Sequence, residues 1–151
     1  MPLREAMRTL EHLVDLGWIR YIGVSNFSVE ELEIARSFLS KYDVVVNQMK
    51  YSLMDRRIER DVLPYCSREE ITVMAYSPLE RGILARNYVL RDIGKKYGRS
   101  ACQVALNWII LHKNVMAIPK SEKISRLKEF ADSMNWKLSY EDFEFLNRYF
   151  K

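Results

Sequence analysis

Cysteine is scarce in this sequence, which contains only Cys66 and Cys102 among its 151 residues. The two lie 36 positions apart, and neither has a CxxC partner or a nearby histidine. Zinc sites and disulfide frameworks need closely spaced ligands or several cysteines that can pair. We therefore predict two reduced, structural cysteines and no metal site.

The sequence also lacks a long apolar run. No stretch of about 18 apolar residues is present to cross a bilayer. The N-terminal segment MPLREAMRTLEHL has no uninterrupted apolar core of the kind found in signal peptides. These two absences predict a cytoplasmic protein with no membrane partner.

Blocks of like charge are absent as well. The 24 Lys and Arg residues are interleaved with 20 Asp and Glu residues, and the net charge is only +4. This pattern gives no basic tail for nucleic acid, so no nucleic-acid partner is expected. The five glycines and four prolines form no linker, and 48% of the residues are hydrophobic. We predict a single globular domain over residues 1–151 with no internal boundary.

Short apolar runs alternate with helical patterns along the chain. The runs begin near Ile19, Val44, Ile71 and Val115, and each has the length of a buried strand. Apolar periodicity and capping residues predict helices over residues 3–16, 28–39, 58–68 and 89–97, and further helices that open at Ser100 and Ser139. Gly17 and Gly98 provide the C-terminal stops of the first and fourth helices.

Strands separated by helices indicate β/α units and a parallel sheet, because parallel neighbours need a crossover connection. Two architectures fit this α/β pattern. One is a free-standing, doubly wound sheet of four strands, and the other is part of a (β/α)8 barrel. Periodicity alone does not choose between them.

Polar side chains follow each of the four apolar runs. They are Ser25 and Asn26, Asn47 and Gln48, Tyr76 and Ser77, and Lys120 and Ser121. Polar residues are common wherever a strand exits to solvent, but amides and hydroxyls at four consecutive strand ends favour a functional face. In barrels the active site lies at these carboxyl ends of the strands.

The segment IPKSEKISR, residues 118–126, has the chemistry of an anion site. Ser121 precedes a predicted helix that runs through Leu127 to Ala131, and the free N–H groups of a helical first turn attract anions. Lys120 adds a point charge, and Arg126 adds a fork that binds phosphate in a bidentate manner. The three residues together suit a phosphomonoester. Considered alone, however, Lys120 and Arg126 are more simply explained as solvated charges at a helix start.

Five motifs in fixed order raise the specificity of this interpretation. They are GVSNF (23–27), NQMKYSLMDR (47–56), AYSPLERGIL (75–84), YGRSACQVALNW (97–108) and IPKS with Arg126. Their order and spacing resemble the C-terminal half of the aldo-keto reductases. These enzymes are NADP-preferring (β/α)8 barrels that pass hydride to aldehydes and ketones. The resemblance implies that this chain carries strands five to eight of such a TIM barrel.

The resemblance also implies roles for residues near the nicotinamide. Ser25, Asn26 and Gln48 would hydrogen-bond the carboxamide, and Tyr76 would stack under the ring. A carboxamide held in this way does not rotate freely, so hydride would leave from one face.

The remaining cofactor residues implied by the resemblance surround the phosphates. Ser77, Leu79 and the turn through Gly82 would lie over the pyrophosphate. The adenosine 2'-phosphate clamp would consist of Lys120, Ser121 and Arg126, with Glu129 fitting the pattern three residues later.

Two positions depart from the family pattern. Glu80 stands where the family often has a small residue, and a carboxylate there would oppose phosphate binding. Phe130 stands where the family usually offers an asparagine to the adenine.

No catalytic residue is predicted within this chain. The family tetrad of Tyr, Asp, Lys and His belongs to the first half of the barrel, which the resemblance places upstream of Met1. His12 and His112 lie in predicted helices, and His112 is expected to be a surface residue that complements the helix dipole. We therefore expect the chain to be inactive alone.

Half a barrel has two unpaired sheet edges and an open apolar face. These predict self-association or binding to a complementary N-terminal half-barrel.

Three functions remain open from the sequence. The first is the NADP-binding half of an aldo-keto reductase, which would reduce a small carbonyl substrate once completed. The second is a non-enzymatic regulatory subunit, or remnant, that binds a nicotinamide nucleotide. The third is a doubly wound domain of unrelated function, although the absence of GxGxxG after the first strand counts against a Rossmann site.

Overall fold

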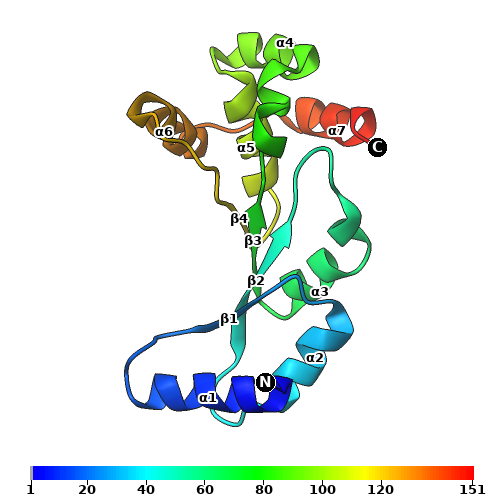
Figure 1. Cartoon of the computed structure of the whole chain (residues 1–151). Coiled ribbons are helices and arrows are strands. Elements are labelled where there is room, and N and C mark those ends of the chain that lie inside the picture. Colours follow the sequence, from blue (N-terminus) through cyan, green and yellow to red (C-terminus); the bar gives the residue numbers. More distant parts are fainter. Residues whose placement is uncertain (1) are drawn as a thin grey trace. The chain divides into compact units, whose positions relative to one another are not determined.

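Helices and strands alternate along the chain in a computed structural model that describes residues 2–151 (Figure 1). Four strands form one sheet in the order β1-β2-β3-β4. Their bounds are β1 Ile22–Ser25, β2 Val44–Lys50, β3 Thr72–Tyr76 and β4 Val115–Ala117. β1 and β2 pair in parallel, with Ser25 opposite Gln48. The predicted parallel α/β fold is confirmed.

The α-helices occupy most of the chain between the strands. They are α1 Leu3–Asp15, α2 Val29–Ser37, α3 Val62–Arg68, α4 Tyr88–Tyr97, α5 Ala101–Ile110, α6 Ile124–Ala131 and α7 Tyr140–Tyr149. Four 3-10 turns accompany them: η1 Arg57–Arg60, η2 Glu80–Gly82, η3 Leu84–Arg86 and η4 Asp132–Met134. Among residues 2–151, no helix combines the length and hydropathy needed to cross a membrane.

The chain forms two compact units. The first comprises residues 1–49 and 58–74, and the second comprises residues 50–57 and 75–151. Strand β3 begins in the first unit and ends in the second. The prediction of one domain over the whole chain stays a prediction.

A buried carboxylate fastens α1 in the first unit. Glu11 is only 6% exposed, and its carboxylate accepts hydrogen bonds from the backbone N–H groups of Ser40 and Lys41 at 2.7 and 2.8 Å. The bond from the Lys41 amide is the main reason why the pKa of Glu11 lies below its usual value. This contact ties α1 to the loop that follows α2.

Helix α5 forms the centre of the second unit. Nine of its ten residues are buried, as expected for a helix that is apolar on all sides. Ser100 and Gln103 form the predicted capping box at its start. Trp108 is fully buried and lies 5.4 Å from the Tyr51 ring, so it is a core residue of this unit.

His112 was predicted to be a surface residue, and this was wrong. Its ring is half-buried, 4.6 Å from the Trp108 ring, and its Nε2 atom lies 3.1 Å from the Tyr51 hydroxyl. Contacts with Tyr51 and Phe143, which are distant in sequence, draw the ring into an aromatic cluster. A helical pattern alone does not reveal such contacts.

Two predicted element bounds also change. The helix expected over residues 58–68 is divided into η1 and α3, because Asp61 leaves helical geometry and its side chain accepts the Val62 N–H as an N-cap. The first strand is shorter than its apolar run and begins at Ile22 rather than near Ile19. The other capping predictions, at Ser28, Ser139, Gly17 and Gly98, are confirmed.

Gly94 supplies a test of the packing in the second unit. A Cβ atom at this buried position would lie 2.3 Å from the backbone oxygen of Arg99. We expect Gly94→Ala to lower the free energy of unfolding by about 1–3 kcal/mol, the usual cost of overpacking. The exposed Arg91→Ala variant on the same helix should change it by less than about 0.5 kcal/mol. Urea unfolding would measure both, and equal stabilities would contradict the packing described here.

Candidate functional site

The first unit brings three predicted residues together at the carboxyl ends of β1 and β2. Ser25 Oγ donates a hydrogen bond to the Gln48 backbone oxygen at 3.0 Å, and the Asn26 N–H donates to the same oxygen at 2.8 Å. The Gln48 side-chain amide donates to Met74 Sδ at 3.2 Å. Ser25 and Gln48 also line a cavity of about 410 Å³ on this unit. The predicted carboxamide site is therefore a local cluster.

The side chain of Asn47 holds the turn that contributes Ser25 and Asn26 to this cluster. Its side chain is fully buried and makes two hydrogen bonds with the backbone of Phe27, one to the carbonyl at 2.9 Å and one from the N–H at 3.4 Å. Asn26, the residue before Phe27, has a positive φ of 60°, a conformation that asparagine tolerates better than most residues. The buried amide thus fastens the turn that carries Ser25 and Asn26.

The second unit contains a pocket of about 380 Å³ between the loop after β3 and the start of α6. Five predicted cofactor residues line it: Ser77, Leu79, Gly82, Lys120 and Arg126. Behind Leu79 lies a small hydrophobic core made by Cys102, Leu106 and Phe130. The sequence-based prediction of phosphate-binding residues therefore converges on one cavity.

Cations dominate the rim of this pocket. Arg81, Lys120 and Arg126 line it, and none of the described residues that line it is acidic. Lys120 pairs with Glu122 at 2.7 Å, but both side chains are more than 80% exposed, so water weakens this pair strongly. The pocket therefore suits an anionic ligand.

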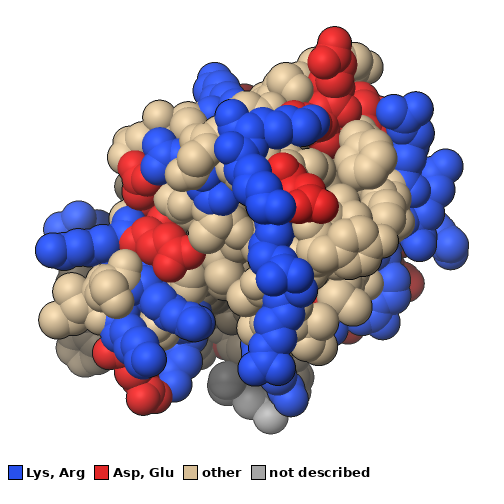
Figure 2. Space-filling view, turned by 90° about the horizontal axis from the view of Figure 1, so that it is seen from above, with Lys and Arg blue, Asp and Glu red and all other residues tan. Residues whose placement is uncertain are grey.

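The charge of the pocket matches that of its unit. Residues 50–57 and 75–151 contain 17 Lys and Arg against 9 Asp and Glu, whereas the first unit contains 7 against 11. Figure 2 shows Lys and Arg side chains gathered in a band across one face. Most of this basic excess lies in the continuous segment 75–151, so it can be counted from the sequence once the bounds of the units are known.

The loop after β3 has an unusual backbone. Ser77, Glu80 and Arg81 all have positive φ, at 52°, 45° and 52°, and Gly82 follows at 93°. A residue with a side chain in this conformation costs on the order of 1 kcal/mol or more. Such strain persists only where surrounding contacts enforce it, and it is concentrated at functional sites.

The Glu80 carboxylate makes its contacts with loop 50–57 of the same unit. It accepts a 2.6 Å hydrogen bond from Ser52 Oγ and lies 3.3 Å from Lys50 Nζ. Glu80 is not among the residues that line the pocket. The predicted weakening of phosphate binding by Glu80 stays a prediction, and Lys50 of the same unit partly offsets the charge of the carboxylate.

Ser121 precedes α6, as predicted, but it is not the N-cap of this helix. Helix α6 begins at Ile124 with Lys123 as its N-cap, and the Ser121 hydroxyl accepts the Lys123 N–H at 3.2 Å. Arg126 consequently occupies the first turn of α6. Of the predicted 2'-phosphate clamp, Lys120 and Arg126 line the pocket and Ser121 does not.

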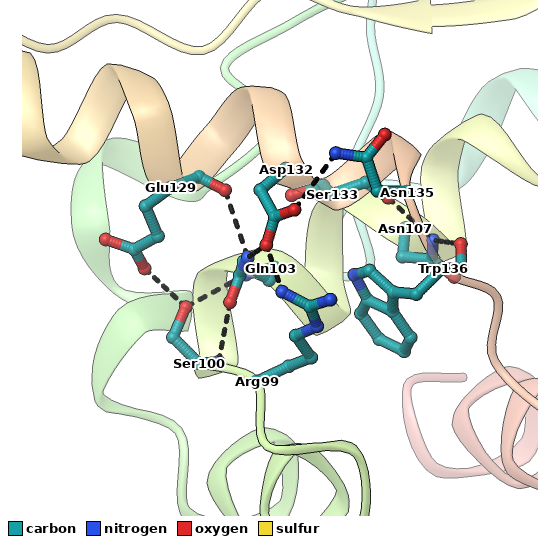
Figure 3. A network of polar contacts seen from close by, with 9 residues as sticks. All are labelled: Arg99, Ser100, Gln103, Asn107, Glu129, Asp132, Ser133, Asn135 and Trp136. Carbon is teal, nitrogen blue, oxygen red and sulfur yellow. Dashed lines mark hydrogen bonds and ion pairs between the residues drawn. The ribbon is translucent and has the colours of Figure 1, made fainter.

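Tyr76 and Glu129 also fall outside the lining of this pocket. Tyr76 is the last residue of β3, and its backbone oxygen accepts a hydrogen bond from the Tyr51 N–H. Glu129 is half-buried, and its carboxylate accepts a hydrogen bond from the Ser100 hydroxyl (Figure 3). Their proposed cofactor contacts stay predictions.

Two side-chain amides of α5 hold the segment that carries α6, as Figure 3 shows. Gln103 Nε2 donates to the Glu129 backbone oxygen at 3.1 Å and to Asp132 at 3.0 Å. Asn107 is buried and donates to the backbone oxygens of Ser133 and Trp136. These amides hold the end of α6, the helix that contains Arg126, and the segment that follows it. Sequence reasoning missed their role, although both are polar residues inside an otherwise apolar helix.

Trp136 packs against its own unit. Its half-buried ring lies 5.1 Å from the Tyr97 ring, and the Arg99 guanidinium lies 5.8 Å from its centroid. A tryptophan in this segment either packs within the loop or lines a substrate rim. These contacts favour the packing role.

The two cysteines are buried and unpaired. Burial raises the pKa of the Cys66 thiol to about 11 and also raises the pKa of Cys102. Thiols of this kind are poor nucleophiles near neutral pH. Within residues 2–151, no group of three or more His, Cys, Asp or Glu residues is arranged to hold a metal ion.

Comparison with known proteins shows the family to which the chain belongs. The family model for the aldo/keto reductase family matches residues 1–149. Methylglyoxal reductase YeaE of Escherichia coli is 35% identical over 149 residues, which cover 95% of this chain and 52% of that protein. Glyoxal reductase of Bacillus subtilis is 38% identical over 143 residues, 93% of this chain and 50% of that protein.

A solved structure gives the same result. The aldo-keto reductase from Klebsiella pneumoniae in complex with NADPH superposes with a TM-score of 0.91 at 33% identity, over 99% of this chain and 55% of that one. The chain therefore spans about half the length of the curated relatives it matches.

Asp132 gives the pocket's supporting network a measurable pH dependence. Asn135 donates to its carboxylate at 3.0 Å and is the main reason why the pKa of Asp132 lies below its ordinary value of about 4. A lowered folded-state pKa gives stability that is present above the ordinary pKa and lost as pH falls through the folded value. Asp132→Asn should therefore melt at a lower temperature at pH 7 and lose less stability below about pH 4. Parallel melting curves for the wild type and the variant would contradict this, and exposed Glu141→Gln is the matched control.

Proposed function

Since the chain belongs to the aldo/keto reductase family, we propose that it is the NADP-binding part of an oxidoreductase that reduces small carbonyl compounds. The observation that carries this proposal is the cationic pocket of the second unit. Ser77, Leu79, Gly82, Lys120 and Arg126 converge on it from separate segments of the chain. NADP is the anionic ligand that we assign to it.

The chemistry of the pocket suits the phosphates of NADP. Arg126 offers a planar fork for bidentate binding, and Lys120 offers a point charge. Ser121 adds a hydroxyl three residues before α6 begins. We propose that these three residues bind the 2'-phosphate that distinguishes NADP from NAD, and that the loop from Ser77 to Gly82 contacts the pyrophosphate.

The strand ends of the first unit suit an amide ligand. Ser25, Asn26 and Gln48 present a hydroxyl and two side-chain amides, which can both donate and accept hydrogen bonds. We propose that they hold the nicotinamide carboxamide and thereby select the ring face that reacts, with Tyr76 stacking on the ring. The bound cofactor supplies the hydride, and these residues supply its orientation.

Carbonyl reduction also needs a proton donor for the nascent alkoxide. His112 is engaged by Tyr51 and by the backbone oxygen of Trp108, so we do not assign it this role. We propose that the donor and its partners come from a segment equivalent to the half of the relatives that this chain does not span. On this proposal the 151 residues bind cofactor but do not turn over alone.

Each unit exposes apolar side chains that such a segment would cover. In the first unit Tyr21 beside β1 is 74% exposed, and in the second unit Met116 of β4 is 44% exposed. Exposed apolar surface next to a strand invites association. We propose that the chain associates with a complementary N-terminal half-barrel or, in its absence, with itself.

Calorimetric titration of the chain with NADPH and NADH tests the cofactor assignment. We expect saturable binding that favours NADPH. Arg126→Ala should weaken NADPH binding roughly tenfold to a hundredfold, the value of a charge-assisted hydrogen bond, and should leave NADH binding nearly unchanged. Arg91→Ala removes an exposed charge that does not line the pocket and serves as the control. Equal losses for both nucleotides would contradict the 2'-phosphate clamp.

Light scattering coupled to size exclusion tests the association. We expect a species larger than the 18.0 kDa of one chain, because association buries exposed apolar surface. Adding the N-terminal half of an aldo-keto reductase should form a mixed complex and produce NADPH-dependent carbonyl reduction that neither part shows alone. A monodisperse monomer that gains no activity on mixing would overturn this proposal.

A further inference from the structure

Arg81 is a cation of the pocket that the motif comparison did not single out. Its side chain is exposed and lines the cavity beside Lys120 and Arg126. Lys120 is drawn toward Glu122, whereas no ion pair joins Arg81 to an acidic group among the described residues. The positive charge of the Arg81 guanidinium at this pocket is therefore not already neutralised by an acidic group of the described residues.

The backbone at Arg81 explains why it lines the pocket. Its φ of 52° and that of Glu80, 45°, lie in the left-handed region, which residues with a side chain adopt only under constraint. Two short backbone bonds close the turn, from the Glu80 N–H to the Ser77 oxygen and from the Gly82 N–H to the Leu79 oxygen. A loop held in this shape needs an anchor.

The Glu80 carboxylate is that anchor. It accepts a hydrogen bond from Ser52 and pairs with Lys50, each through a different carboxylate oxygen. Ser52 is fully buried, and its hydroxyl also accepts the N–H groups of Met54 and Asp55 at 3.1 and 3.0 Å. The anchor point is thus itself fixed. The two adjacent residues therefore have different roles. Glu80 holds the loop, and Arg81 lines the cavity.

We propose that Arg81 binds a nucleotide phosphate in this pocket, and that Glu80 is a positioning residue that holds the loop so that Arg81 reaches it. This inference rests on the proposed NADP function and extends it to two residues. Both the 2'-phosphate and the pyrophosphate have the chemistry that a guanidinium recognises. The choice of nucleotide in the experiment distinguishes them.

The test for Arg81 is calorimetric titration of the full chain with NADPH and with NADH. Arg81→Ala should weaken binding roughly tenfold or more and reduce its dependence on salt, and Arg81→Lys should restore part of the affinity. A loss for both nucleotides assigns Arg81 to the pyrophosphate, and a loss for NADPH alone assigns it to the 2'-phosphate. The matched control is Arg86→Ala, which removes an exposed arginine of the same unit that does not line the pocket.

Glu80→Ala separates positioning from simple electrostatics. Removing a negative charge near a cationic pocket would by itself strengthen phosphate binding. A positioning role predicts the opposite, a severalfold weaker affinity of Glu80→Ala for the nucleotide. Glu80→Gln keeps a hydrogen bond to Ser52 and should therefore retain most of the wild-type affinity. In the Arg81→Ala background, Glu80→Ala should add no further loss, because the two effects act through one contact.

Melting curves for every variant establish that each is folded. If wild type binds NADPH and Arg81→Ala binds it equally well, this inference falls while the proposed function stands. If Glu80→Ala strengthens binding, the positioning role falls. If wild type binds neither nucleotide, both the proposed function and this inference are overturned.

Discussion

The second unit depends on two side-chain amides inside an apolar helix. Helix α5 is buried on nearly every side, so any polar group on it must find a partner within the fold. Gln103 and Asn107 find theirs in the backbone of residues 129–138. Burying an amide without partners costs more than a hydrogen bond contributes, so these bonds specify one path for the chain after α6. The bond from Gln103 to the Glu129 oxygen also holds the end of α6, the helix that contains Arg126.

Much of the fold could be read from local signals. The capping pairs at Ser28 and Ser100, the stop at Gly98 and the four apolar runs all act over a few residues, and the structure confirms them. The failures share a different cause. His112 is drawn inward by residues distant in sequence, and a single side chain, Asp61, divides a helical pattern in two. Periodicity reports which face of a helix is apolar but does not report what fills the space beside it.

The candidate site was predictable to a similar degree. Motif order led to five residues that share a pocket and to the cluster of Ser25, Asn26 and Gln48. It did not single out Arg81 within the motif AYSPLERGIL, because motif order does not show which side chains line a cavity. The sequence placed Glu80 in the same loop but did not show its contacts with Ser52 and Lys50. The charge difference between the two units was not singled out from the sequence, although most of the second unit is one continuous segment, residues 75–151.

The left-handed backbone at Ser77, Glu80 and Arg81 has a consequence for recognition. Disordered loops must lose conformational entropy when a ligand arrives, and that loss subtracts from affinity. Here the loop's shape is set during folding, at the expense of global stability. A ligand therefore meets a preorganised surface, and its affinity reflects the contacts formed rather than the ordering of a chain. A loop strained in this way lowers the stability of the fold but presents a fixed surface that can select its ligand. The residues that hold the strain need not touch the ligand.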